Sequence, residues 1–271
     1  NKAKISDSLK KKTSPKNFNK NPIKGTKFTV MISSAKGGVG KSTFAINLTF
    51  ALQKLGKKVG LLDADIHGPS LPKMIGLNEK PKSDGKFLFP LEKYGAQFMS
   101  LGFLVDDKTP MIWRGPMVIS AIKTLTGKVL WKNLDFLIID MPPGTGDTQL
   151  TFAQDIKIDG AIIVSTPQEL ALMDVQRGIQ MFDKTKIKIL GLIDNMSFFK
   201  GDDGKKYTIF GEGGVERIAK EFEKKFLGKI PINTELRESA DLGLPLTYKK
   251  PDHEVSKIFS EIAKKITEDV L

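Results

Sequence analysis

The stretch SAKGGVGKST (34–43) decides the fold expected for this chain of 271 residues. It lies between an apolar run, FTVMISS (28–34), and a segment with helical spacing, STFAINLTFALQKLG (42–56). A glycine-rich loop at a helix start turns successive backbone N–H groups inward, and the helix dipole adds an attraction for anions. The pattern therefore predicts a cradle for the phosphates of a nucleoside triphosphate. A glycine-rich turn without a ligand is the plainer alternative, and the strand–loop–helix context disfavours it.

The loop contains two lysines. Lys41 is placed to reach the β- and γ-phosphates, and the Ser42 hydroxyl is placed to bind Mg²⁺. The common pattern G-x-x-x-x-G-K-S/T would begin with glycine at Ala35, and instead Lys36 follows as a second lysine. The predicted nucleotide-binding residues of the loop are Lys36, Gly37, Gly38, Val39, Gly40, Lys41, Ser42 and Thr43.

Beyond the loop, short apolar runs alternate with helical segments. Strands are expected over 58–64, 96–103, 135–140, 160–166 and 186–194, and helices over 115–131, 147–156, 168–183 and 252–271. Continuous apolar runs indicate strands that are covered on both faces, and the alternation indicates parallel β-α-β crossovers. The pattern predicts an α/β fold with a mostly parallel, doubly wound sheet flanked by helices, formed by one domain over 26–271. The proline-containing segment 66–95 is expected to be an irregular insertion.

Carboxylates follow two of the predicted strands. LLDAD (61–65) ends in Asp63 and Asp65, and DFLIIDMPPGTGD (135–147) contains Asp140 at the end of its apolar run. An isolated Asp at a strand end is commonly a turn former or a helix cap. Ligands of open α/β sheets bind at the carboxyl ends of the strands, so these carboxylates are expected to lie near the phosphate loop. Asp140 is then predicted to hold Mg²⁺ through water.

Four further stretches carry a resemblance to a known family. They are LLDADIHGPSLPKMIG (61–76), MIWRGPMV (111–118), DFLIIDMPPGTGDTQLT (135–151) and IFGEGG (209–214). Together with the loop they resemble the Mrp/ApbC family of P-loop ATPases, related to the Nbp/Ind iron–sulfur proteins. The resemblance covers residues 28 to about 250. It implies a P-loop NTPase fold with the deviant Walker A loop of the MinD/ParA/nitrogenase iron protein group.

The resemblance also implies an activity and roles for single residues. The expected protein is a homodimer that binds ATP and Mg²⁺, hydrolyses ATP slowly, and passes a 4Fe–4S cluster from its dimer interface to apo iron–sulfur client proteins. Lys36 points across that interface onto the partner's phosphates, as an arginine finger does. Asp65 lies in switch I and orients the attacking water or the Mg²⁺ shell. Asn195 hydrogen-bonds adenine, and Pro231 packs on its ring.

The chain departs from the family pattern where a cluster would be bound. Many members carry C-x-x-C between the NMS and IFG motifs, whereas this chain reads FFKGDDGKKYT (198–208) and has no cysteine. Asp202 and Asp203 are hard ligands, and iron–sulfur clusters favour thiolates. GDDG (201–204) is instead expected to form a tight hairpin turn. Direct cluster binding is therefore in doubt, which leaves a carrier with external thiols or one whose cluster step is lost.

The basic charge gathers at the start of the chain. The net charge is +12, and residues 1–27 contain nine lysines and one Asp. Residues 1–25 are predicted to be a basic, disordered linker or arm. No apolar run reaches the roughly 18 residues that span a bilayer, and no signal-peptide pattern appears, so a cytoplasmic protein without membrane contact is expected.

Two other functions remain open. One is a ParA/MinD-like positioning ATPase whose basic tail binds DNA or membrane. Its C-terminal helix has mixed charge, which disfavours a membrane anchor, and nucleic acid is not expected as a partner. The other is a small-molecule kinase or synthetase on the same scaffold, for which no substrate-binding constellation is visible.

Overall fold

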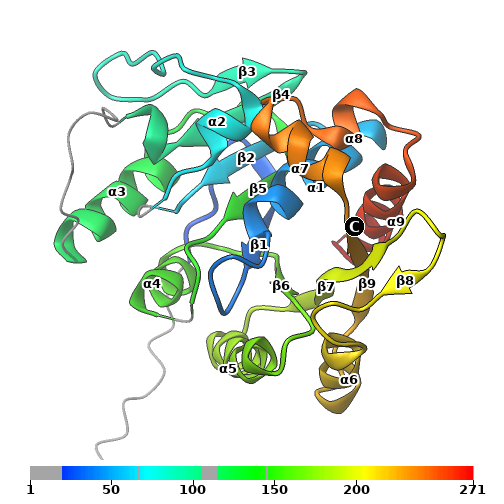
Figure 1. The fold of residues 1–271 in the computed structure, drawn as a ribbon. Coiled ribbons are helices and arrows are strands. Elements are labelled where there is room, and N and C mark those ends of the chain that lie inside the picture. Colours follow the sequence, from blue (N-terminus) through cyan, green and yellow to red (C-terminus); the bar gives the residue numbers. More distant parts are fainter. Residues whose placement is uncertain (1–19, 66–67, 105–114, 145, 271) are drawn as a thin grey trace, which may run out of the picture.

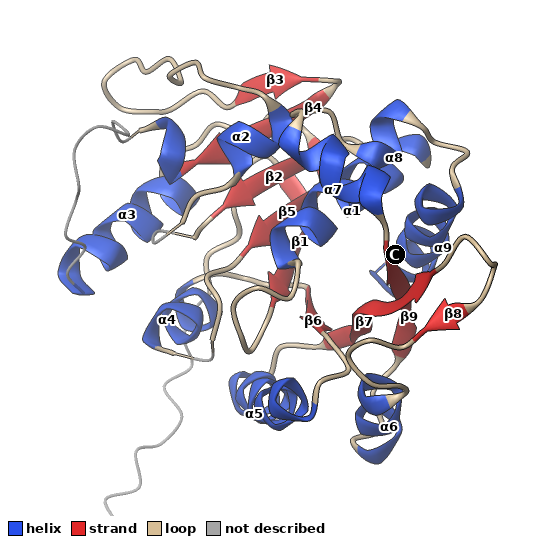
Figure 2. Ribbon diagram, viewed as in Figure 1, coloured by secondary structure: helices blue, strands red, loops and turns tan. Residues whose placement is uncertain are grey.

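One sheet organises the molecule in the computed structural model, which describes residues 20–65, 68–104, 115–144 and 146–270. Within those residues the strand order is β3-β4-β2-β5-β1-β6-β7-β8, with β9 also paired to β7 (Figures 1 and 2). The strands are β1 (Thr26–Ser33), β2 (Val59–Asp63), β3 (Leu91–Lys93), β4 (Ala96–Ser100), β5 (Leu134–Asp140), β6 (Gly160–Ser165), β7 (Ile189–Lys200), β8 (Lys206–Tyr207) and β9 (Phe226–Ile232). Among the described strands, β3 pairs antiparallel with β4, and β8 pairs antiparallel with β7. The other strand pairs are parallel. The predicted, mostly parallel sheet is confirmed.

Helices cover both faces of the sheet (Figure 2). They are α1 (Lys41–Lys54), α2 (Leu71–Ile75), α3 (Gly115–Gly127), α4 (Asp147–Asp155), α5 (Glu169–Thr185), α6 (Gly214–Glu221), α7 (Thr234–Asp241), α8 (Leu246–Lys249) and α9 (Glu254–Val270). Helices α1, α7, α8 and α9 form one layer, and α3, α4, α5 and α6 form the other (Figure 1). In the part of the chain that the structure describes, no helix is long and apolar enough to cross a membrane.

The strand that leads into the phosphate loop lies in the middle of the sheet. β1 pairs in parallel with β5 on one side and with β6 on the other. Val30, Met31 and Ile32 are fully buried in it, as expected for a strand covered by helices on both faces. The register places Ile32 and Asp63 each beside Asp140. The sheet therefore brings the predicted carboxylates to the edge where the loop begins.

Some predicted boundaries were wrong on the β2–β5 side of the sheet. The strand expected over 96–103 ends at Ser100, whose hydroxyl accepts a hydrogen bond from Gly102 N–H and starts the short 3₁₀ helix η1 (Leu101–Phe103). The helix expected over 115–131 ends at Gly127, and the Lys128 carbonyl and the Leu130 N–H hydrogen-bond Leu88 instead. The insertion 66–95 contains α2 and β3, so it is more regular than predicted.

The strand expected over 186–194 was also wrong in extent. β7 continues through the NMSFFK segment to Lys200 and turns back into β8. The predicted tight turn at GDDG is confirmed, since Gly201 N–H donates to Lys205 O and Gly204 N–H donates to Gly201 O. β9 was not predicted, because its glycine and proline weaken a strand pattern. Helices α7 and α8 were not predicted either. Asn195 and Pro231 consequently lie within paired strands and not in loops.

The predicted arm over 1–25 reaches the described part of the chain only at its end. Ile23 is 3% exposed and belongs to the core, and Asn21 forms a bridge to Ile156. Residues 20–25 therefore pack on the domain. Residues 1–19 lie outside the described residues, as do Met111–Arg114 of the WRGP motif and His67 of the HGPS motif.

Candidate functional site

The loop between β1 and α1 encloses a cavity of about 220 Å³. Its lining comes from three separate parts of the chain: Ser34, Gly37, Gly38, Gly40, Lys41, Ser42, Thr43, Asp65 and Pro143. Gly38 and Gly40 have φ angles of +79° and +81°, which only glycine adopts without strain. These angles turn the backbone around the cavity at the start of α1. The loop thus has the form of the predicted phosphate cradle, with the Asp65 carboxylate and the turn at Pro143 at its border.

A buried ion pair lies beneath this cradle. The Lys41 Nζ and Asp140 Oδ1 atoms are 2.5 Å apart, and the two side chains are 6% and 4% exposed. Ser42 also hydrogen-bonds the Asp140 carboxylate. Burial raises the pKa of Asp140, and the Lys41 ammonium and Ser42 hydroxyl oppose that rise. Lys41, which is predicted to bind phosphate, and Asp140, which is predicted to hold Mg²⁺, are therefore paired with each other.

Asp63 forms a second buried carboxylate next to Asp140. Its oxygens accept hydrogen bonds from the Asp65 N–H at 3.0 Å, the Leu71 N–H at 3.2 Å and the Ser100 hydroxyl at 3.0 Å. Burial, together with the charge on Asp140, raises the pKa of Asp63 to about 7. Asp63 connects β2 to β4 and to the first turn of α2, and it fixes the backbone of the predicted catalytic residue Asp65. Asp63 was expected near the phosphate loop, but this positioning role was not predicted from the sequence.

Of the two lysines of the loop, only Lys41 points inward. Lys36 is exposed and does not line either cavity of the site. An exposed lysine at the rim is placed to meet a group that approaches from outside the domain. Its predicted contact with a partner subunit stays a prediction.

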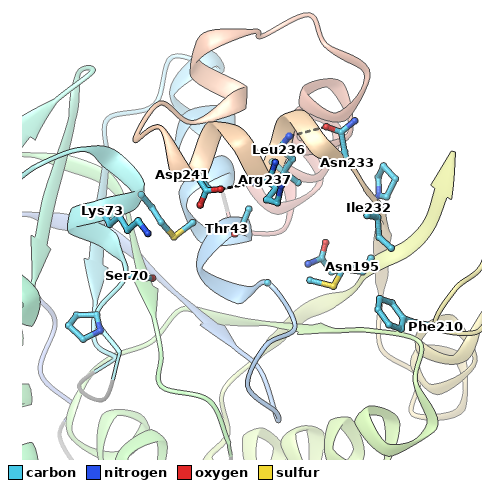
Figure 3. Close-up of a pocket in the computed structure, with 16 residues that line it drawn as sticks. Thr43, Ser70, Lys73, Asn195, Phe210, Ile232, Asn233, Leu236, Arg237 and Asp241 are labelled. Carbon is cyan, nitrogen blue, oxygen red and sulfur yellow. Dashed lines mark hydrogen bonds and ion pairs between the residues drawn. The ribbon is translucent and has the colours of Figure 1, made fainter. Parts of the chain in front are cut away.

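A larger cavity of about 670 Å³ adjoins the cradle and shares Gly40 and Thr43 with it. Figure 3 shows Asn195 and Phe210 on one side of this cavity, Lys73 and Ser70 on the other, and α7 above. Further apolar groups line it: Pro69, Met74, Met196, Pro231, Ile232, Leu236 and Ala240. An apolar slot beside a phosphate cradle fits a nucleoside. Asn195 and Pro231 both lie in its wall, and their predicted contacts with adenine stay predictions.

The Asn195 amide has a defined orientation. Its Nδ2 donates a hydrogen bond of 2.7 Å to the Val39 carbonyl, and the contact is buried. Only the nitrogen of an amide can donate to a carbonyl, so the Oδ1 atom is the end left to accept from a ligand. The contact is so close that a Cβ atom on Gly40 would lie 2.3 Å from Asn195 Nδ2. Asn195 thus joins β7 to the phosphate loop.

Gln149 is a residue of the site that the sequence analysis missed. It is 1% exposed, its Oε1 accepts from the Ser33 hydroxyl at 2.9 Å, and its Nε2 donates to the Pro142 carbonyl at 2.8 Å. It therefore links the end of β1 to the turn after β5 at residues 142–144, which the family resemblance predicts to be switch II. The glutamine lies in the family-like stretch 135–151, but nothing in the local pattern indicated its partners.

The segment where the family resemblance places cluster ligands, residues 198–208, is a closed hairpin. Asp203 accepts hydrogen bonds from the Lys205 N–H at 3.0 Å and the Tyr207 hydroxyl at 2.9 Å. Lys206 Nζ lies 4.7 Å from the centre of the Phe198 ring. No group of three His, Cys, Asp or Glu side chains that could hold a metal ion occurs among the described residues. With no cysteine in the chain, these residues do not fit an iron–sulfur cluster.

Comparison with known proteins gives relatives over nearly the whole chain. Residues 25–267 match the ParA-type family described as NUBPL iron-transfer P-loop NTPase. The iron–sulfur cluster carrier protein of Aquifex aeolicus is 46% identical over 257 residues, covering 93% of this chain and 71% of that protein. The iron–sulfur cluster transfer protein NUBPL of Mus musculus is 45% identical over 249 residues, covering 90% of this chain and 78% of that protein.

Solved structures agree with the fold. The nucleotide-binding protein of Archaeoglobus fulgidus in complex with ADP has a TM-score of 0.74 and 38% identity, covering 87% of this chain and 93% of that one. The cell division ATPase MinD of Pyrococcus furiosus has a TM-score of 0.65 and 22% identity, covering 89% and 98%. At that identity the likeness to MinD shows the fold alone.

Proposed function

Because the chain belongs to the NUBPL iron-transfer P-loop NTPase family, we propose that it is an ATP-dependent carrier or assembly factor for iron–sulfur clusters. In this proposal it acts as a homodimer whose geometry the nucleotide switches, and it hydrolyses ATP slowly. The observation that carries the nucleotide part is the pair of adjoining cavities that share Gly40 and Thr43, one fit for phosphates and one for a nucleoside.

The base slot favours adenine. The free Oδ1 of Asn195 can accept from the exocyclic amino group of adenine, whereas guanine would present a carbonyl oxygen there. Pro231 and Phe210 offer apolar surface to the ring. An unpaired buried oxygen opposite a carbonyl costs free energy, so the wrong base is rejected.

The residues at the cradle fit Mg²⁺. The Ser42 hydroxyl and the carboxylates of Asp140 and Asp65 are hard oxygen ligands, which this ion prefers. When bound, Mg²⁺ neutralises charge on the β- and γ-phosphate oxygens. To reach the phosphates, Lys41 would turn away from Asp140, and the freed Asp140 carboxylate would hold the ion through water. Binding of the nucleotide thus prepares the Mg²⁺ ligands.

Hydrolysis is proposed to need the second copy. Lys41 supplies charge from within the domain, and Asp65, positioned by Asp63, would orient the attacking water. The exposed Lys36 would add its charge to the partner's phosphates, where negative charge grows in the transition state. Slow turnover follows if this lysine is in place only in the closed dimer.

The cluster is the cargo in this proposal, and this chain's own side chains do not fit it. Thiols would therefore come from outside, from a small thiol or from the client protein. Apo iron–sulfur proteins are the proposed clients. A cytoplasmic location stays a prediction from the sequence, and so does the basic arm predicted over 1–25, apart from residues 20–25, which pack on the domain. No comparison favours a positioning ATPase that binds DNA or membrane.

Two lysine variants test the nucleotide mechanism. Lys41→Ala is expected to abolish ATP binding, whereas Lys36→Ala should spare binding and remove hydrolysis. Binding would be measured with fluorescent ATP and hydrolysis by phosphate release, with the exposed Lys220→Ala as a matched control. Normal turnover by Lys36→Ala would reject the contribution of a lysine from the partner.

Cargo binding needs its own experiment. The purified dimer would be reconstituted anaerobically with iron and sulfide, with and without glutathione, and iron would be counted per dimer. Iron retained only with glutathione supports carriage through external thiols. No iron retained in either condition contradicts cluster carriage and leaves the ATPase function standing alone.

A further inference from the structure

Ser34, at the junction of β1 and the phosphate loop, carries a hydroxyl without a partner. The residue is 1% exposed, and its Oγ is buried with no hydrogen bond to any residue that the structure describes. It also lines the phosphate cavity, together with Asp65 and Pro143. A buried hydroxyl without a partner costs free energy, and native proteins leave few of them. An unpaired hydroxyl on a residue that lines a ligand cavity points to a partner on the ligand.

The surroundings of Ser34 identify which end of the nucleotide it would meet. Its carbonyl accepts a hydrogen bond of 2.8 Å from the N–H of Gly144, in the switch II turn. Ser34 therefore lies between the start of the loop and switch II, the side of the cradle that holds the terminal phosphate. Gly40 and Thr43, which the cradle shares with the nucleoside slot, mark the opposite side, where the inner phosphates bind.

We propose that Ser34 contacts the terminal phosphate, with its Oγ–H donating a hydrogen bond to a γ-phosphate oxygen. This inference rests on the proposed ATP-binding function and adds a residue to it. A hydroxyl that donates to an anionic oxygen forms one of the stronger hydrogen bonds. The contact exists only with a triphosphate, so Ser34 helps the protein to distinguish ATP from ADP. Because the same residue's carbonyl holds Gly144, the contact also reports the γ-phosphate to switch II.

Ser34→Ala tests the proposal, because the variant removes the hydroxyl without creating a new unpaired group. The affinities for ATPγS and ADP would be measured by fluorescence on the full chain. The ratio of the two affinities should fall roughly tenfold or more, with ADP affinity nearly unchanged. Ser34→Thr, which keeps the hydroxyl, should retain most of the ratio.

A matched control comes from the same fold. Ser256 in α9 also has a buried Oγ without a partner, but it does not line the phosphate cavity. Ser256→Ala should leave both nucleotide affinities unchanged. The urea midpoint of either alanine variant should equal or exceed that of the wild type, because each loses an unsatisfied buried group.

The outcomes separate the possible failures. An unchanged ratio in Ser34→Ala overturns the proposal, and so does an equal loss of both affinities with a lower urea midpoint, which indicates a structural role. If Ser34→Ala does not fold, Ser34→Gly gives the same comparison. A wild-type chain that binds neither nucleotide refutes the proposed function itself.

Discussion

Replacing Lys41 with methionine tests the buried ion pair beneath the phosphate loop. Lys41 and Asp140 are only 6% and 4% exposed, and their charged atoms are 2.5 Å apart. Methionine keeps much of the apolar stem and removes the charge, which leaves the Asp140 carboxylate buried beside Asp63. Loss of one partner of a buried pair costs about 3–5 kcal/mol. For a domain of this size, that loss lowers the melting temperature by about 6–20 °C.

The assay is thermal unfolding without nucleotide or Mg²⁺, followed by circular dichroism. The double variant Lys41→Met/Asp140→Asn removes both charges and should recover much of the loss, because a neutral buried pair needs no compensation. As a control, Lys27 forms a pair with Asp135 at 2.7 Å but is 70% exposed, so Lys27→Met should cost less than about 1 kcal/mol.

The stability loss caused by Lys41→Met should depend on pH, because Asp140, the partner of the lysine, lies beside a second buried carboxyl. Asp63 has a pKa raised to about 7, and the pKa of Asp140 is also raised, chiefly by burial. Carboxyls with raised folded-state pKa values stabilise the fold at low pH and lose that contribution as pH rises through those values. The destabilisation by Lys41→Met should therefore be larger at pH 8 than at pH 5. A variant that melts with the wild type at both pH values, or a double variant no more stable than the single one, would refute the reasoning.

Two further substitutions have effects that the structure defines. Gly40→Ala should weaken ATP binding at least roughly tenfold, because its Cβ would lie 2.3 Å from Asn195 Nδ2. Gly204→Ala, at φ +76° with nothing within 4 Å, is the control, and equal nucleotide affinities in the two variants would contradict the steric argument. Asp194 is buried with Oδ1 unpaired, and burial raises its pKa from 3.8 to about 6. Its stabilising contribution is lost as pH rises from about 4 to 6, so Asp194→Asn should be more stable than the wild type at pH 8 by on the order of 1–2 kcal/mol in urea unfolding. An identical pH profile of stability for the wild type and Asp194→Asn would contradict this.

Features that depend on residues adjacent in the sequence could be predicted without the structure. The glycines of 36–43 allow the positive φ angles of the loop by themselves, and the apolar runs on either side indicate a buried strand and a helix. The position of Asp140 at a strand end followed in the same way. The hairpin at 201–204 was also predictable, because Asp-Gly favours that turn wherever the strands lie.

Weak local patterns explain the elements that were missed. β9 contains a glycine and a proline, which are uncommon in strands, yet it is held by pairing along β7. β7 continues past Asp194 because β8 and β9 offer it partners. In both cases the pairing with another strand overrides the local preference.

The sequence by itself determined that this chain has a phosphate loop on a parallel sheet, and that it has no thiolate for a cluster. Only the tertiary structure decided that Lys41 holds Asp140, 99 residues away, and that Asn195 reaches Val39 across 156 residues. It also decided that the Ser34 hydroxyl has no hydrogen-bond partner among the described residues. The physical reason is that loop conformation depends on contiguous residues, whereas these contacts depend on strand order and register, which bring distant side chains within hydrogen-bonding distance.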